Sequence, residues 1–182
     1  MATTSATVGK SKHPAIPLNL RLRRVAFAML GSATPEWAGR KAELMFRTPS
    51  RRPRPIDEHV LLLNARPLTL EIAGLSLAGY QWQPRDADLG LPPVLVQHGW
   101  ESRASQLAPL VNALLAAGHR VVAFDAPAHG DSQGRRTTVS GFADTVLAID
   151  RAHGPFHAAI GHSVGGAAVL AAATRGLRTR LV

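Results

Sequence analysis

The residues with the clearest chemical meaning form the pentapeptide Gly161-His162-Ser163-Val164-Gly165, followed by a further glycine. An apolar segment precedes it and a helical segment follows, so Ser163 falls at a predicted strand-to-helix turn. A serine at such a turn needs strained backbone angles that lift its hydroxyl above the sheet, and flanking glycines remove clashing Cβ atoms. The pattern predicts a nucleophilic serine. The alternative is a glycine-rich turn in which Ser163 only caps the helix.

Two further motifs follow apolar segments. His98-Gly99-Trp100 comes directly after the apolar run at residues 94–97. The sequence FDAPAHGDS, residues 124–132, comes after the next apolar run. Because ligands of open parallel sheets bind at the carboxyl ends of the strands, these positions are suited to a functional site.

Around these motifs the sequence predicts alternating strands and helices. Residues 68–72 and 75–82 alternate in polarity on either side of Gly74 and predict a β-hairpin. Short apolar runs predict strands at 94–97, 120–124 and 156–160, and helical segments follow at 104–117, 139–152 and 164–174. Leu181-Val182 is typical of the start of another strand. This alternation indicates a parallel sheet covered on both faces.

The three motifs, in this order and each at a strand end, resemble the α/β-hydrolase superfamily from about residue 68 to residue 182. The resemblance implies an α/β class structure, the α/β-hydrolase fold, with a mostly parallel sheet and an N-terminal hairpin. It implies that Ser163 is the catalytic nucleophile and that the backbone N–H groups of Trp100 and Val164 form the oxyanion hole. The residues that would support these turns are His98, Gly99, Gly161, Gly165 and Gly166.

The motif at residues 125–132 contains an acid and a histidine, Asp125 and His129. The resemblance gives this loop a structural role at the edge of the site rather than the role of general base. Ala128 stands where the family usually has glycine, a departure that concerns the geometry of the turn.

The other members of a serine triad are missing from the expected positions. In the family the acid and the histidine follow the serine, yet the nineteen residues after Ser163 contain no Asp, Glu or His. His119, His153 and His157 are predicted at the opposite end of the sheet, and His162 should point away from the hydroxyl. Serine without an imidazole partner is a poor nucleophile at neutral pH. We therefore expect a fold truncated after the nucleophile helix, from a truncated product or partial gene model, with little or no activity.

The beginning of the chain differs in charge from the rest. Residues 1–60 hold eleven Lys/Arg against four Asp/Glu, whereas residues 61–182 hold ten against eight. We expect a basic extension over 1–55, partly disordered, with short helices in 18–47 and a Pro/Arg linker at 48–55, and the hydrolase-like domain over 56–182. Such an extension should be dispensable for the fold. It is typical of a solvated arm, with a tether to nucleic acid or an anionic membrane as the alternative.

Composition excludes several classes of protein. The absence of cysteine excludes a disulfide scaffold, a thiolate metal site and cysteine catalysis. No cofactor or metal motif is present, and no segment approaches the ~20 apolar residues of a membrane span. The apolar run after Arg24 is too short for a signal-peptide core and lacks a cleavage site, so an amphipathic helix and a cytoplasmic protein are expected.

We therefore expect a serine hydrolase that acts on a small-molecule ester, thioester or amide, a carboxylic ester foremost. The alternative is a non-catalytic binding protein with the same fold. No specific nucleic-acid partner is predicted, and neither the substrate nor the oligomeric state follows from the sequence.

Overall fold

The computed structural model describes residues 17–84 and 90–182. The chain divides into two compact units, Met1–Leu44 and Met45–Val182. The first unit contains α1 (Leu18–Ala33) and most of α2 (Pro35–Phe46), in the stretch where the sequence predicts two short helices. Among the described residues, no helix combines the length and the apolar character that crossing a bilayer requires.

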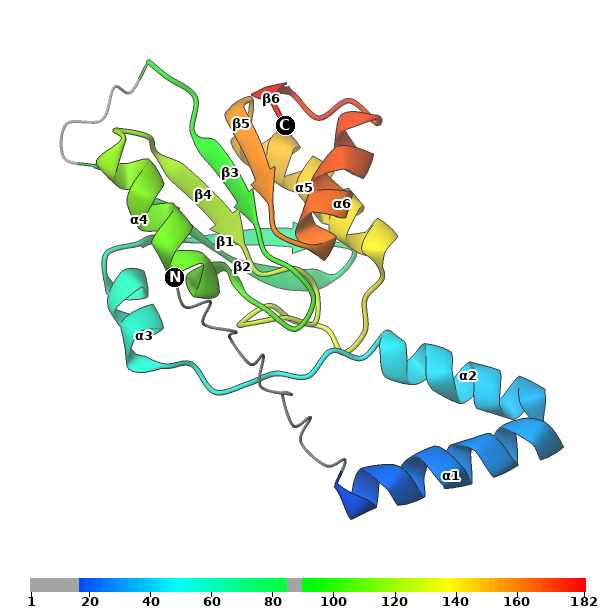
Figure 1. Cartoon of the computed structure of the whole chain (residues 1–182). Helices are drawn as coiled ribbons and strands as arrows, with labels where there is room; N and C mark the ends of the chain where they lie inside the picture. Colours follow the sequence, from blue (N-terminus) through cyan, green and yellow to red (C-terminus); the bar gives the residue numbers. More distant parts are fainter. Residues whose placement is uncertain (1–16, 85–89) are drawn as a thin grey trace, which may run out of the picture. The chain divides into compact units, whose positions relative to one another are not determined.

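A six-stranded sheet forms the centre of the second unit, in the order β1-β2-β4-β3-β5-β6 (Figure 1). Strands β1 (Arg66–Ile72) and β2 (Leu75–Trp82) form an antiparallel hairpin, and β2 pairs antiparallel with β4 (Val121–Phe124). Strands β4, β3 (Val94–Gln97), β5 (Phe156–Gly161) and β6 (Thr179–Leu181) are parallel. The predicted hairpin and mostly parallel sheet are confirmed, and the strand expected at Leu181 begins at Thr179.

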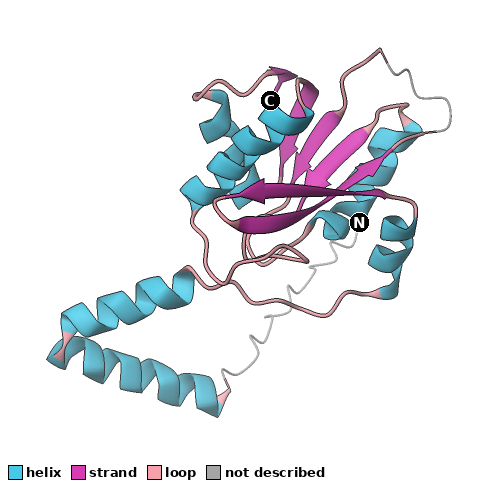
Figure 2. Ribbon diagram, turned by 180° about the vertical axis from the view of Figure 1, so that it is seen from behind, coloured by secondary structure: helices cyan, strands magenta, loops and turns pink. Residues whose placement is uncertain are grey.

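Helices cover both faces of this sheet because its central strands are apolar on both sides. On one face, Leu95 and Val122 pack in a core with α5 (Val139–His153) and α6 (Val164–Ala173). On the other, their neighbours Val94 and Val121 pack with α3 (Ile56–Leu63) and α4 (Ala108–Ala116). Figures 1 and 2 show α5 and α6 together, on the side away from α3 and α4. The alternation along each strand thus builds two cores.

Two helical predictions need correction. The helix expected at 104–117 begins with a separate 3₁₀ turn, η1 (Ala104–Leu107), and α4 starts only at Ala108. Pro109 has no N–H to donate to the carbonyl of Ser105, so it fits the first turn of a helix better than its interior, and α4 begins beside it. The sequence also missed α3, which starts directly after Pro55 with acidic residues in its first turn, a favourable place for negative charge.

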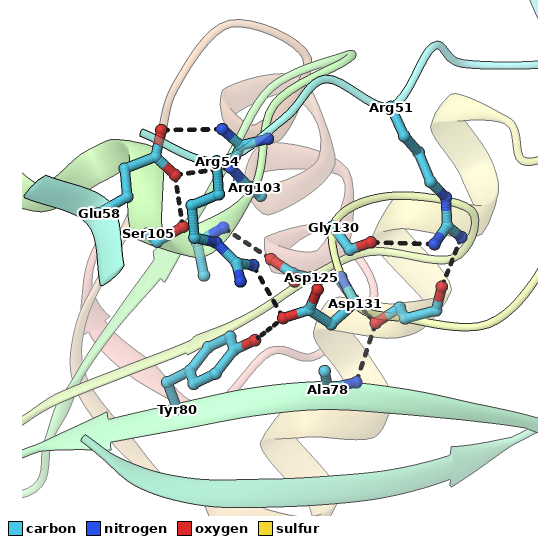
Figure 3. A network of polar contacts seen from close by, with 12 residues as sticks. Arg51, Arg54, Glu58, Ala78, Tyr80, Arg103, Ser105, Asp125, Gly130 and Asp131 are labelled. Carbon is cyan, nitrogen blue, oxygen red and sulfur yellow. Dashed lines mark hydrogen bonds and ion pairs between the residues drawn. The ribbon is translucent and has the colours of Figure 1, made fainter. Parts of the chain in front are cut away.

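Residues 45–55, called the strap below, belong to the same unit as the sheet, although composition assigned them to the extension. Arg51 donates hydrogen bonds to the carbonyl oxygens of Gly130, Ser132 and Gly134, at 2.9, 2.6 and 3.2 Å. These carbonyls lie in the loop after β4, more than seventy residues further along the chain (Figure 3). The unit boundary therefore lies before the strap rather than after it.

A buried ion pair fixes the end of the strap. Arg103 bonds Glu58 through Nε to Oε2 at 2.6 Å and through Nη2 to Oε1 at 2.9 Å (Figure 3). Arg103 also donates to the carbonyls of Arg52 and Pro53, and the hydroxyl of Ser105 donates to Glu58 at 2.6 Å. Burial acts to raise the pKa of Glu58, but the hydrogen bonds from Arg103 and Ser105 outweigh it and hold that pKa below its usual value.

Deletion of the strap should destabilise the sheet. We compare the chain 45–182 with the chain 56–182, which loses the Arg51 bonds and leaves Arg103 without two carbonyl acceptors. With about 1 kcal/mol for each lost hydrogen bond, the free energy of unfolding should fall by roughly 3 kcal/mol or more. Urea unfolding followed by circular dichroism measures it. Equal stability of the two chains would mean that the strap is only a linker.

Breaking the buried ion pair should also be costly. Arg103→Met leaves the Glu58 carboxylate buried without its partner, and we expect a loss of about 3–5 kcal/mol in the free energy of unfolding. Arg136→Met, at an exposed position, is the matched control and should change it by less than about 0.5 kcal/mol. Similar effects of the two substitutions would contradict the role given to the pair.

Candidate active site

Ser163 lies on a sharp turn between β5 and α6. Its backbone angles are φ 56° and ψ −123°, a strained conformation for a residue with a side chain. The side chain is exposed, and its hydroxyl makes no cap hydrogen bond to α6. The alternative that Ser163 merely caps the helix is therefore wrong.

Two glycines allow this turn to close. A Cβ on Gly161 would lie 2.4 Å from the carbonyl of Gly165, and a Cβ on Gly165 would lie 2.4 Å from the carbonyl oxygens of Gln97 and His98. No side chain can occupy such space, so the positions require glycine. Gly166 is less restricted, since a Cβ there would be 3.1 Å from the nearest oxygen.

The turn His98-Gly99-Trp100 lies against the Ser163 turn. Strands β3 and β5 are neighbours, and a Cβ on Gly99 would lie 3.1 Å from the Cβ of Ser163. Val164 is the first residue of α6, so its N–H has no acceptor within the helix. Among the described residues, no acceptor pairs with the N–H of Trp100 either. Two N–H groups on adjoining turns thus have no hydrogen-bond acceptor in the described part of the chain.

His98 joins two of the loops at this end of the sheet. Its Nε2 accepts a hydrogen bond from the N–H of Ala126 at 2.9 Å, and its Nδ1 lies 2.7 Å from the carbonyl of Gly99. These partners fit a neutral ring that carries its proton on Nδ1. Burial lowers the pKa of His98 to about 3, against the opposing effect of the Gly99 carbonyl. Its nitrogens are engaged in structure, so it has no free nitrogen for base catalysis.

An aromatic cluster holds the side chain of Trp100. The indole stacks on Phe46 from α2 at 5.5 Å and on Phe142 from α5 at 6.1 Å. His129 meets it edge-on at 5.2 Å. Contacts from three directions restrict the rotation of the turn and therefore the direction of its backbone N–H.

In the loop after β4, Asp125 and His129 form hydrogen bonds with backbone groups. Asp125 is fully buried and accepts hydrogen bonds from the N–H groups of Ala104 and Asp131, at 2.7 and 2.8 Å. Burial raises the pKa of Asp125 to about 6. His129 accepts from the N–H of Glu101 at 3.1 Å, and burial lowers its pKa. Neither side chain is placed to activate Ser163.

Ala128, which stands where the family usually has glycine, has a φ of 69°. This left-handed conformation costs an alanine roughly 1 kcal/mol, which is the physical reason glycine suits the position. The loop nevertheless closes, through a hydrogen bond from the N–H of Ala128 to the carbonyl of Gln133 at 2.9 Å.

Four other histidines in the described part of the chain contact other rings or lie exposed. His119 and His157 stack on each other at 5.5 Å, beside the amino ends of their strands. His153 is the last residue of α5 and contacts Phe124. His162 is exposed beside Gly99. Within residues 17–84 and 90–182, no group of three His, Asp or Glu side chains could hold a metal ion.

Comparison with known proteins gives a consistent picture. Residues 94–182 match the family model described as Alpha/beta hydrolase family. An esterase of Pyrococcus furiosus is 22% identical, with a TM-score of 0.59, over 73% of this chain and 54% of that one. The thioesterase domain from the curacin biosynthetic pathway is 24% identical, with a TM-score of 0.55, over 65% and 46%. The protein Est1E of Butyrivibrio proteoclasticus, solved with ferulic acid bound, is 23% identical, with a TM-score of 0.53, over 59% and 47%.

At these identities the likeness concerns the fold, and the chain spans about half the length of each of these structures. No curated protein sequence matches the chain.

The buried His98 should make stability depend on pH. Its folded-state pKa lies far below the ordinary value of about 6.5, so its contribution is complete above pH 6.5 and is lost as pH falls toward 3. Asp125 has the opposite effect on the free energy of unfolding. Because its pKa is raised to about 6, its protonation as pH falls below 6 stabilises the folded state. His98→Gln removes the first effect and leaves the second.

The difference in unfolding free energy between the parent and His98→Gln should therefore shrink by about 2 kcal/mol from pH 7.5 to pH 5. Urea unfolding at pH 7.5, 6 and 5 measures it, and the Asp125 contribution cancels in the comparison. A difference that stays constant with pH would show that His98 is not held neutral.

Proposed function

Because the chain carries the N-terminal part of an α/β-hydrolase fold, we propose that Ser163 is the nucleophile of a serine hydrolase. The substrate would be a small acyl compound, an ester, thioester or amide. The observation that supports this most is the conformation of Ser163. At φ 56° its side chain is exposed, its hydroxyl makes no cap hydrogen bond, and the N–H groups of Trp100 and Val164 have no acceptor among the described residues. A strained serine whose hydroxyl makes no cap hydrogen bond has a side chain with no evident role in holding the fold.

In the proposed reaction, the Oγ of Ser163 attacks the acyl carbon and its proton passes to a general base. The carbonyl oxygen becomes an oxyanion, which accepts hydrogen bonds from the N–H groups of Trp100 and Val164. Each such donor stabilises the transition state by roughly 3–4 kcal/mol. The alcohol, thiol or amine leaves with a proton, and water then hydrolyses the acyl-serine.

The general base is the part of this mechanism that the described residues do not supply. His98 and His129 are committed to backbone partners, and residues 164–182 contain no histidine or acid. The proposed reaction therefore requires an additional acid and histidine beside Ser163. The 182 residues alone hold the nucleophile and the oxyanion donors.

A non-catalytic binding protein is the second candidate. The observations in its favour are that His98 and His129 are engaged with backbone groups and that residues 164–182 contain no Asp, Glu or His. Such a protein would bind an acyl compound at the two turns without turning it over.

Ser163 of the 182-residue chain should react slowly with a fluorophosphonate probe, and added imidazole should accelerate the reaction several-fold by acting as an external base. The acceleration should grow as pH rises through about 6.5–7, because only neutral imidazole accepts a proton. Mass spectrometry of the labelled peptide gives the rate at Ser163 itself. Hydrolysis of activated esters should stay near background.

Ser163→Ala should abolish this labelling, whereas Ser140→Ala, at another exposed serine, should leave it unchanged. Labelling that survives Ser163→Ala would refute the nucleophile assignment. No labelling at any imidazole concentration would favour the binding protein.

A further inference from the structure

Helix α1 presents an apolar stripe to solvent. Leu18, Leu22, Val25 and Met29 recur at intervals of three and four residues, which places them along one side of a helix. They are 69%, 61%, 57% and 68% exposed. Apolar residues in this pattern normally face a core, yet α1 has no buried residue at all.

The second apolar row of α1 behaves differently. Leu20, Phe27 and Leu30 lie on another side of the helix and are 47%, 37% and 46% exposed. They are thus more covered than every member of the first stripe. The exposed stripe, Leu18, Leu22, Val25 and Met29, is the face of the unit Met1–Leu44 that lacks a partner among the described residues.

The charges of this unit are mostly positive. Arg21, Arg23 and Arg24 are on α1, and Arg40 and Lys41 are on α2, against Glu36 and Glu43. Residues 17–44 therefore hold five basic and two acidic side chains, a net charge of +3. Arg21 is three residues after Leu18 and four before Val25, so it neighbours the exposed stripe directly.

We propose that α1 docks on the surface of an anionic lipid bilayer, with the exposed stripe among the upper acyl chains. A basic helix with an exposed apolar stripe is the form that binds in the plane of such a surface, and the stripe is the more exposed of the two apolar rows of α1. Arg21, which neighbours the stripe, can extend its stem along it and place its guanidinium group among lipid phosphates, and Arg23 and Arg24 add positive charge to the same helix. Nucleic acid would match the charge, but it offers nothing to cover four aliphatic side chains.

Flotation of the whole chain with vesicles tests the proposal. We expect binding to vesicles of phosphatidylcholine with about 30% phosphatidylglycerol, and at least tenfold weaker binding to phosphatidylcholine alone. Raising the salt concentration should weaken binding to the anionic vesicles, since screening reduces the attraction between exposed charges. Equal binding to both vesicle types, or binding to neither, would overturn the proposal.

Two variants separate the apolar and the charged contributions. Leu22→Gln with Met29→Gln should weaken binding to the anionic vesicles by about tenfold or more. Arg23→Gln with Arg24→Gln should weaken it by about fivefold for each charge removed. The matched control is Leu170→Gln with Leu181→Gln, at positions 61% and 60% exposed on α6 and β6, which should bind like the parent. Far-UV circular dichroism checks that helix content is kept.

Other occupants of the exposed stripe give distinct results. A second copy would show as a dimer in sedimentation without lipid, lost in the Leu22→Gln and Met29→Gln variant. A contact with the unit Met45–Val182 would show as a lower melting temperature of that variant. Equal binding of duplex DNA by the parent and by the Leu22→Gln and Met29→Gln variant would identify a nucleic-acid arm. Each of these, found without vesicle binding, would overturn the proposal.

Discussion

The close approach of two glycine-lined turns governs the carboxyl end of the sheet. Gly165 sits so near the carbonyl oxygens of Gln97 and His98 that a Cβ would be 2.4 Å from both. This approach seats the first turn of α6 on the end of β3. Any larger residue would push α6 away and carry Ser163 with it. The position of Ser163, the proposed nucleophile, relative to the Trp100 N–H is therefore set by backbone packing rather than by a side-chain contact.

The same end of the sheet contains buried polar side chains, and two of them, Asp125 and His98, form hydrogen bonds with backbone groups. The buried Asp125 accepts two N–H groups, and the buried His98 connects the loops after β3 and β4. A buried polar group left without a partner would cost about 1–3 kcal/mol, so each bond also fixes the course of a loop. Arg51 and Arg103 extend this pattern to the strap through carbonyl acceptors. The loops are thus positioned by a hydrogen-bond network in which few residues can be substituted.

The sequence predicted the local features well and the long-range ones poorly. The strands, the hairpin and the turn at Ser163 depend on residues adjacent in the chain, such as the glycines at 161 and 165. The strap was mistaken for a linker because its proline and arginine content is typical of one. Nothing near Arg51 indicates that its acceptors would be carbonyl groups at residues 130–134. Acceptors of that kind leave no signature in residue type, so only the structure could reveal them.

The difference between local and long-range features also explains the role of Trp100. The proposed oxyanion donor is its backbone N–H, which any residue except proline would provide. A tryptophan at this position must therefore be explained by what its side chain does, and the indole stacks on both Phe46 and Phe142. A donor that must point at a developing charge is effective only when its direction is fixed beforehand. The side chain accordingly contributes stiffness rather than chemistry, and Phe46, which ends α2 and belongs to the strap, is part of that stiffness despite its distance in sequence.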